Sequence, residues 1–115
     1  MKLWVDDARP APNGYEWCKS VNEAIITIKL RESRIENILR RYTPSKTRMN
    51  DLSIELIDID YDAGGYAPFG GDYIKLLDWL EETGRNYPIR IHSMNPVGVE
   101  NMRRIIQRNG WTEVK

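Results

Sequence analysis

The only histidine of the chain, His92, stands directly before a serine, Ser93, at the end of an apolar stretch. Histidine changes protonation near neutral pH, so His92 can act as a general acid or base. It could equally ligate a metal ion or serve only as a structural hydrogen-bonding group. Asn95 and Pro96 form a turn immediately afterwards. The sequence therefore marks this segment as a candidate functional site.

Carboxylates occur at the ends of two other apolar stretches. Asp6 and Asp7 follow the first of these stretches, and Asp60 and Asp62 follow another. Four carboxylates gathered in one place would repel one another unless a cation neutralised them. Mg²⁺ prefers oxygen ligands and can bridge to phosphate oxygens. We therefore expect these four residues to bind Mg²⁺ or Mn²⁺. In the alternative interpretation, Asp7 and Asp62 cap local structure while the others face water.

A phosphate site is expected beside the carboxylates. A helix predicted to start after Asn95 would present free backbone N–H groups and the positive end of its dipole, and both attract anions. Arginine can bind a phosphate through two parallel hydrogen bonds. The candidate phosphate ligands are Arg9, Ser93, Asn95, Gly98, Asn101 and Arg103. Alternatively, Asn95 is only a helix N-cap and Arg103 lies on a solvent-facing surface.

The elements that must position these residues can be read from the apolar pattern. Five strands are predicted near residues 2–6, 15–19, 53–60, 88–93 and 111–114. Amphipathic helices are predicted after Ser20, with a break near Ser33, and before Gly84 and Gly110. The polar stretch after Tyr42 is expected to be a loop. Alternating strands and helices predict an α/β fold, a doubly wound parallel sheet with helices on both faces.

This arrangement makes residues 1–115 a single domain and brings the chemistry together. The apolar run from Leu52 to Ile59 should be the central strand, because only a strand buried on both faces shows so little alternation. Ligands of such sheets bind outside the carboxyl ends of the strands. The aspartates and His92 all fall at those ends, so we expect them to meet in one crevice.

Composition excludes several classes of protein. Hydrophobic residues make up 41% of the chain and charged residues 30%, and 17 Lys and Arg balance 17 Asp and Glu. This neutral total does not favour a duplex DNA binder. Residues 29–48 are mostly basic and residues 51–82 mostly acidic, which predicts either a local anion-binding surface or a solvated helix face. No membrane span or signal peptide is predicted, and the lone Cys18 excludes an internal disulfide, so a cytoplasmic location is expected. A homodimer stays open.

The order of the segments resembles a response-regulator receiver domain. Receivers carry an acidic pair after the first strand, an acceptor aspartate after the third and a Ser or Thr after the fourth. Asp6-Asp7, Asp60 and Ser93 match those positions, and the loop 8–14 stands in place of the first helix. A closer resemblance is to cyclic-phosphate-processing receiver-like domains, through "LWVDDARPAP", "IDIDYDAGG" and "IRIHSMNPVGVENM". Tyr61 stands where that group usually has a histidine.

The residues and the resemblance together predict a hydrolase or phosphodiesterase. Its substrate would be a cyclic or terminal phosphate of a nucleotide or an RNA end, and His92, Asp60 and Asp7 would be catalytic. The alternatives are a module that senses a phosphorylated ligand without turnover and a degenerate receiver that acts through protein contacts. We expect Asp60→Asn and His92→Ala to abolish turnover with little loss of stability, because polar groups at strand tips seldom hold a core together.

Overall fold

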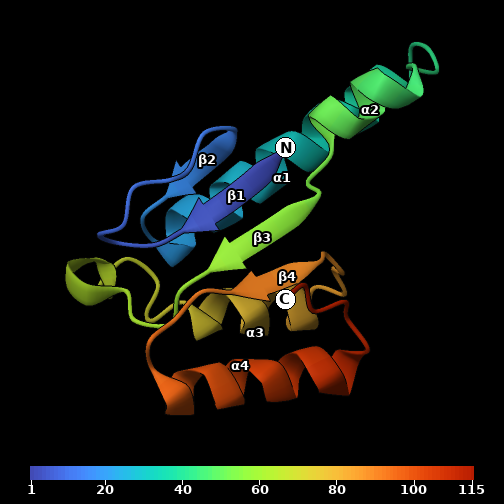
Figure 1. Cartoon of the computed structure of the whole chain (residues 1–115). Helices are drawn as coiled ribbons and strands as arrows, with labels where there is room; N and C mark the ends of the chain where they lie inside the picture. The colour runs from blue at the N-terminus through green and yellow to red at the C-terminus, as the bar shows by residue number, and fades with distance from the viewer.

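Four parallel strands form the sheet of this protein, for which a computed structural model describes residues 1–115. They are β1 (Lys2–Val5), β2 (Tyr15–Cys18), β3 (Leu56–Ile59) and β4 (Ile89–Ile91), in the spatial order β2-β1-β3-β4 (Figure 1). The predicted α/β class and parallel sheet are confirmed. All four residues of β3 are buried, and β3 lies between β1 and β4 as predicted for a central strand.

The predicted fifth strand is wrong, because residues 111–114 form only an isolated bridge. Glu113 pairs with Ile89 in a parallel sense, and no ladder continues from that pair. The chain reaches this point directly from a helix C-terminus, where the N–H of Trp111 still donates to the carbonyl of Ile106. Only Ile89 of β4 bonds to this segment, donating its N–H to the carbonyl of Thr112 and accepting the N–H of Val114.

The helices are α1 (Val21–Leu39), α2 (Lys46–Leu52), α3 (Ile74–Glu82) and α4 (Pro96–Asn109), with a short 3₁₀ turn η1 (Gly64–Tyr66). Ser20 caps α1 as predicted, because its hydroxyl oxygen accepts the N–H of Glu23 at 3.0 Å. The predicted break near Ser33 is wrong, since α1 is continuous there. No helix is both long and apolar enough to cross a membrane.

The helix α2 corrects the loop that was expected after Tyr42. Its N-cap is Ser45, whose hydroxyl oxygen accepts the N–H of Arg48 at 3.2 Å. Only Leu52 in this helix is buried, and a helix this short with a single buried residue shows no apolar period in the sequence. Because α2 extends to Leu52, the third strand begins at Leu56 rather than at residue 53.

The prediction of helices on both faces is wrong, because all the long helices contribute to a core on one face of the sheet. Val5, Ile57 and Ile89 pack there with buried residues of α1, α3 and α4. Right-handed crossovers explain this, because the chain moves across the sheet in one direction from β2 to β3 and from β3 to β4. The opposite step, from β1 to β2, is made by a loop. In Figure 1, α1 and α3 lie behind the sheet. Trp4 and Trp17 pair with each other, alternate with the buried Val5 and Cys18, and are partly exposed, so they lie on the face opposite this core.

Candidate functional site

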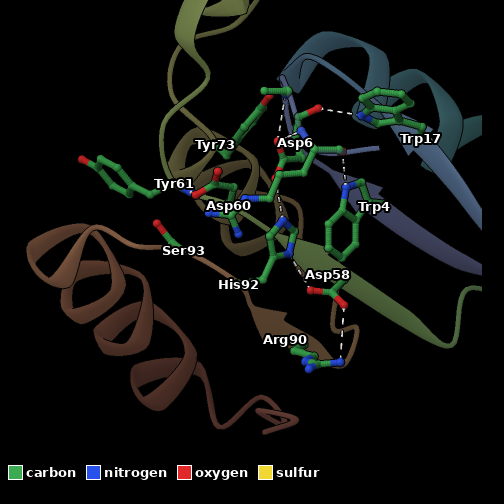
Figure 2. A network of polar contacts seen from close by, with 12 residues as sticks. Trp4, Asp6, Trp17, Asp58, Asp60, Tyr61, Tyr73, Arg90, His92 and Ser93 are labelled. Carbon is green, nitrogen blue, oxygen red and sulfur yellow. Dashed lines mark hydrogen bonds and ion pairs between the residues drawn. The ribbon is translucent and has the colours of Figure 1, made fainter. Parts of the chain in front are cut away.

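His92 is held between two buried carboxylates at the edge where β1, β3 and β4 end. Its Nδ1 lies 2.6 Å from an oxygen of Asp58, and its Nε2 lies 2.9 Å from an oxygen of Asp6 (Figure 2). The side chains of these two aspartates are 2% and 1% exposed. Two carboxylate acceptors match the two N–H donors of a protonated imidazole ring. The geometry lets a doubly protonated ring donate one hydrogen bond to each carboxylate, and its single positive charge balances one of the two negative charges.

A tryptophan fixes the plane of the His92 ring. Trp4 stacks on it with the ring centroids 3.8 Å apart and the planes inclined by 4°. Strand register explains the contact, because Trp4 pairs with Asp58 and Asp58 pairs with Arg90, so these side chains share one face of the sheet. His92 lies two residues after Arg90 and returns to that face. Arg90 adds a longer ion pair to Asp58, at 3.8 Å.

Asp6 is ionised and rigidly placed. One of its oxygens accepts the backbone N–H groups of Ala8 and Arg9, each at 2.9 Å, and the other faces His92. Burial opposes ionisation of this carboxyl, but the N–H groups of Arg9 and Ala8 and the His92 ring together hold the pKa of Asp6 below its ordinary value. Asp6 is thus a fixed negative charge at neutral pH.

Two indole rings secure the loop that carries Asp6, Asp7 and Arg9. The indole N–H of Trp17 donates to the carbonyl of Asp6 at 2.7 Å, and that of Trp4 donates to the carbonyl of Arg9 at 2.8 Å. Both tryptophans project from the face of the sheet that no helix covers. They order the loop in place of the helix that is absent between β1 and β2.

Asp60 completes a group that could hold a metal ion. Asp6, Asp60 and His92 each offer one ligand atom, and these atoms lie within 4.8 Å of one another. Asp60 also accepts the N–H of Tyr61 at 2.7 Å. Two oxygens and one nitrogen leave room for water or phosphate oxygens around a divalent cation. The structure thus brings together Asp6 and Asp60 of the expected metal ligands.

The other two expected ligands stand apart from this group of three. Asp7 lies against Gly64, where an added Cβ would come within 2.3 Å of its carboxylate oxygen. Burial, and then the negative charges of Asp7, Asp6 and Asp60, raise the pKa of Tyr73. The Asp62 carboxylate faces the amide of Asn95 at 3.4 Å. A ligand role for Asp7 and Asp62 stays a prediction.

The start of α4 is largely satisfied by its own cap. The side-chain oxygen of Asn95 accepts the N–H of Gly98 at 3.0 Å, and the hydroxyl of Ser93 accepts the N–H of Asn95 at 3.2 Å. Gly98 is buried against Tyr61, whose ring atoms lie 2.4 to 2.7 Å from where a Cβ would be. These residues therefore shape the turn after β4, whatever they contribute to phosphate binding.

The expected phosphate-binding arginines differ in their surroundings. Arg103 is engaged with Glu113 through three hydrogen bonds of 2.8 to 3.0 Å, so it is not free to meet a phosphate. Arg9 is exposed, and its guanidinium has no hydrogen bond or ion pair within the protein. Asn101 is partly buried on α4. Of the two arginines, Arg9 is therefore the better placed to bind a phosphate.

Asp58 is a site residue that the sequence prediction missed. It lies inside the strand β3, whose neighbours Ile57 and Ile59 are fully buried. A charged residue inside a buried apolar strand is the signal that could have found it, because such residues are almost never buried unless they are paired. Its spacing of two residues from Asp60 also places both on one face.

The site is an edge rather than a pocket. Three cavities indent the surface, and none of them is lined by Asp6, Asp60 or His92. A ligand at this edge would therefore be bound from one side, against the ends of the strands.

A comparison with known protein families agrees with this arrangement of site residues. An acidic pair follows β1, an aspartate follows β3 and a His-Ser pair follows β4. Residues 1–108 match the family described as cyclic-phosphate processing receiver domain. The chain belongs to this family. Comparison with the curated proteins and with the solved structures gave no match. The family assignment confirms the resemblance seen in the sequence and indicates a role in the processing of cyclic phosphates.

Proposed function

We propose that this receiver domain hydrolyses a cyclic phosphodiester of a nucleotide or of an RNA end. One observation carries the proposal: His92 is fixed at the carboxyl edge of the sheet between Asp58 and Asp6, with Asp60 alongside. This supplies a proton donor and fixed charges at one place. The family name supports the substrate class.

Hydrolysis adds water across one P–O bond of the cyclic ester. The water oxygen bonds to phosphorus, the ring P–O bond breaks, and the departing oxygen takes up a proton. His92 donates that proton from Nε2, the ring nitrogen that faces Asp6, to a departing oxygen that lies within hydrogen-bonding distance of it. Asp58 keeps the other ring nitrogen occupied at 2.6 Å, which orients the ring. Asp60 accepts the proton lost by the water, so protons balance overall.

A divalent cation would be held by the converging carboxylate oxygens of Asp6 and Asp60. His92 would not be a ligand in this mechanism, because its Nε2 holds the proton that is donated and its Nδ1 lies against Asp58. Bound there, Mg²⁺ or Mn²⁺ would stabilise the negative charge that builds up on the phosphate. Carboxylate oxygens suit these hard ions.

Turnover of a panel of 2′,3′-cyclic and 3′,5′-cyclic nucleotides, followed by ³¹P NMR with Mg²⁺ or Mn²⁺, tests the proposal. We expect a monoester product and a loss of about a hundredfold or more in kcat for Asp60→Asn and His92→Gln. Arg104→Gln is the matched control, because Arg104 is 67% exposed on α4 away from the cluster. Absence of any turnover by the wild-type protein would overturn the proposal.

A second function, binding of the same phosphate without turnover, is favoured by one observation. Both ring nitrogens of His92 are already occupied by carboxylates. A module of this kind would shift the His92 and Asp6 resonances on addition of a cyclic nucleotide and return the nucleotide unchanged. The ³¹P spectrum therefore separates the two functions in one sample.

A further inference from the structure

The largest cavity of the molecule lies far from His92, where the end of α1 meets α2. Its volume is about 520 Å³, within the usual range for small-molecule sites. Figure 1 shows α2 beyond the beginnings of the strands, whereas His92 follows the end of β4. Three arginines line the cavity: Arg34 of α1, Arg41 in the turn after it and Arg48 of α2.

These arginines have no anionic partner in the protein. No aspartate or glutamate lines the cavity, and the ion pairs of the chain all involve other residues. The nearby Glu36 is already paired with Arg40 at 2.7 Å. Three exposed guanidinium groups around one hollow therefore have no counter-charge in the protein, and an anion bound among them would supply it.

The cavity also has apolar and aromatic walls. Tyr42 is 51% exposed and Leu30 is 66% exposed, and both line the same cavity as the arginines. A phosphate matches the planar, two-pronged guanidinium group. A flat base can stack on an exposed tyrosine ring, and such stacking tolerates any base. Inorganic phosphate or a carboxylate would use only the arginines and would leave Tyr42 and Leu30 in water.

We propose that this cavity is a nucleotide-binding site, with the phosphate on Arg34, Arg41 and Arg48 and the base on Tyr42. The ligand is either a free mononucleotide or one nucleotide of a single-stranded RNA, since both present the same phosphate and base. This site is separate from the His92 edge and does not depend on the function proposed for it. The proposal assigns a specific ligand to the basic residues 29–48.

Isothermal titration of the full chain with AMP, a hexanucleotide RNA and inorganic phosphate tests the site. We expect Arg34→Gln, Arg41→Gln and Arg48→Gln each to weaken AMP or RNA binding severalfold, and the triple variant to weaken it at least tenfold. Tyr42→Ala should weaken binding of AMP or RNA and leave that of inorganic phosphate unchanged. Stronger binding of RNA than of AMP identifies a strand as the ligand, and equal binding identifies a mononucleotide.

Arg40→Gln is the matched control, because it removes the same charge from the same region but Arg40 does not line the cavity. His92→Gln should leave this binding intact, so failure at the His92 edge and failure here are distinguishable. The proposal is overturned if Arg40→Gln weakens binding as much as Arg41→Gln, or if Tyr42→Ala has no effect on AMP and RNA. It is also overturned if neither ligand binds, or if an acidic peptide binds there more tightly than both.

Discussion

At the scale of single residues, the contacts of His92 predict that His92→Ala lowers the free energy of unfolding. Removing the ring leaves Asp58 and Asp6 buried without their shared partner, and breaking such a buried charge pair typically costs about 3 kcal/mol or more. We therefore expect a loss of about 3 kcal/mol in the free energy of unfolding, measured by urea denaturation. The sequence alone favoured little loss, because it placed His92 at a tip rather than between two buried carboxylates.

Ser93→Ala is the control for this measurement. Ser93 is the next residue along, and its hydroxyl accepts one hydrogen bond, from Asn95, so its removal should cost about 1 kcal/mol. If His92→Ala costs no more than Ser93→Ala, the two aspartates do not depend on the ring.

The carboxyl of Asp6 should contribute to the acid sensitivity of the fold. Its native pKa lies below the ordinary value of 3.8, so its contribution to stability is fully present above that value. The contribution is lost as the pH falls through the lower native pKa. Asp6→Asn should therefore flatten the decline in unfolding free energy on acidification, measured by urea titrations at several pH values. If the unfolding free energy of wild type and of Asp6→Asn falls with the same slope on acidification, Asp6 does not contribute to the acid sensitivity.

Other carboxyl groups will keep part of that decline in both proteins. The Arg85 and Tyr87 side chains, acting against burial, hold the pKa of Glu32 low, and Arg103 holds the pKa of Glu113 low. The comparison must therefore be made between slopes rather than between midpoints.

Asp6, Asp60 and His92 could be predicted as a group because each directly follows a strand. Parallel strands bring their carboxyl ends to one edge, so chain position alone implied that these residues meet. The contact of Asp58 with His92 and the pairing of Arg103 with Glu113 could not be predicted in this way. Their roles depend on strand register and on where the last residues return to β4, which local pattern does not specify.

At the scale of elements, the packing of α4 on the loop after β3 depends on Gly98. A Cβ at this position would meet the Tyr61 ring at 2.4 Å, and overpacking of this kind costs about 1–3 kcal/mol. Alanine otherwise favours a helix over glycine by about 1 kcal/mol. Gly98→Ala should thus destabilise the wild-type protein and stabilise a Tyr61→Ala variant. A double-mutant cycle by thermal unfolding measures this reversal of sign, and additive effects would contradict the clash.

The loop 6–9 should depend on the two indole N–H groups that hold it. Trp17→Phe keeps the aromatic ring but removes the donor to the Asp6 carbonyl. We expect faster hydrogen exchange at the amides of Ala8 and Arg9, which bond to the Asp6 carboxylate. Trp79→Phe on α3 is the control, because the indole N–H of Trp79 makes no hydrogen bond in the protein. Equal hydrogen-exchange rates at these amides in the two variants would show that the order of the loop does not depend on the Trp17 hydrogen bond.

Four of the five predicted strands and the long helices followed from the sequence, whereas the short helix α2 and the structure of the final segment did not. The apolar period over α1, α3 and α4 is long enough to be read, and Ser20 and Gly110 mark ends that the structure confirms. The helix α2 has only seven residues and one buried side chain, so its pattern looks like that of a polar loop. The final segment has strand-like residues, but only Glu113 pairs with β4, so no ladder forms.

At the scale of the whole molecule, the zero net charge hides a separation of charge along the long axis. The unpaired arginines lie on α1, on the turn after it and on α2, whereas Asp6 and Asp60 directly follow β1 and β3. In Figure 1, α2 lies beyond the beginnings of the strands, away from the ends of β1 and β3. The topology produces this, because α1 and the residues after it lead back to the beginnings of the strands while the loops after β1 and β3 lie at their ends.

This separation predicts that duplex DNA binds weakly. A duplex binder usually contacts 6–10 phosphates, and each contact adds about 0.9 to the slope of log affinity against log salt. A patch with three free arginines on one short projection would reach about three phosphates, which corresponds to a slope of roughly 2.7. The acidic edge would repel a duplex that extended along the molecule. Fluorescence anisotropy with a labelled 20-base-pair duplex between about 50 and 200 mM salt should therefore show no sub-micromolar affinity. A sub-micromolar affinity with a slope above about 6 would show that a much larger basic surface takes part.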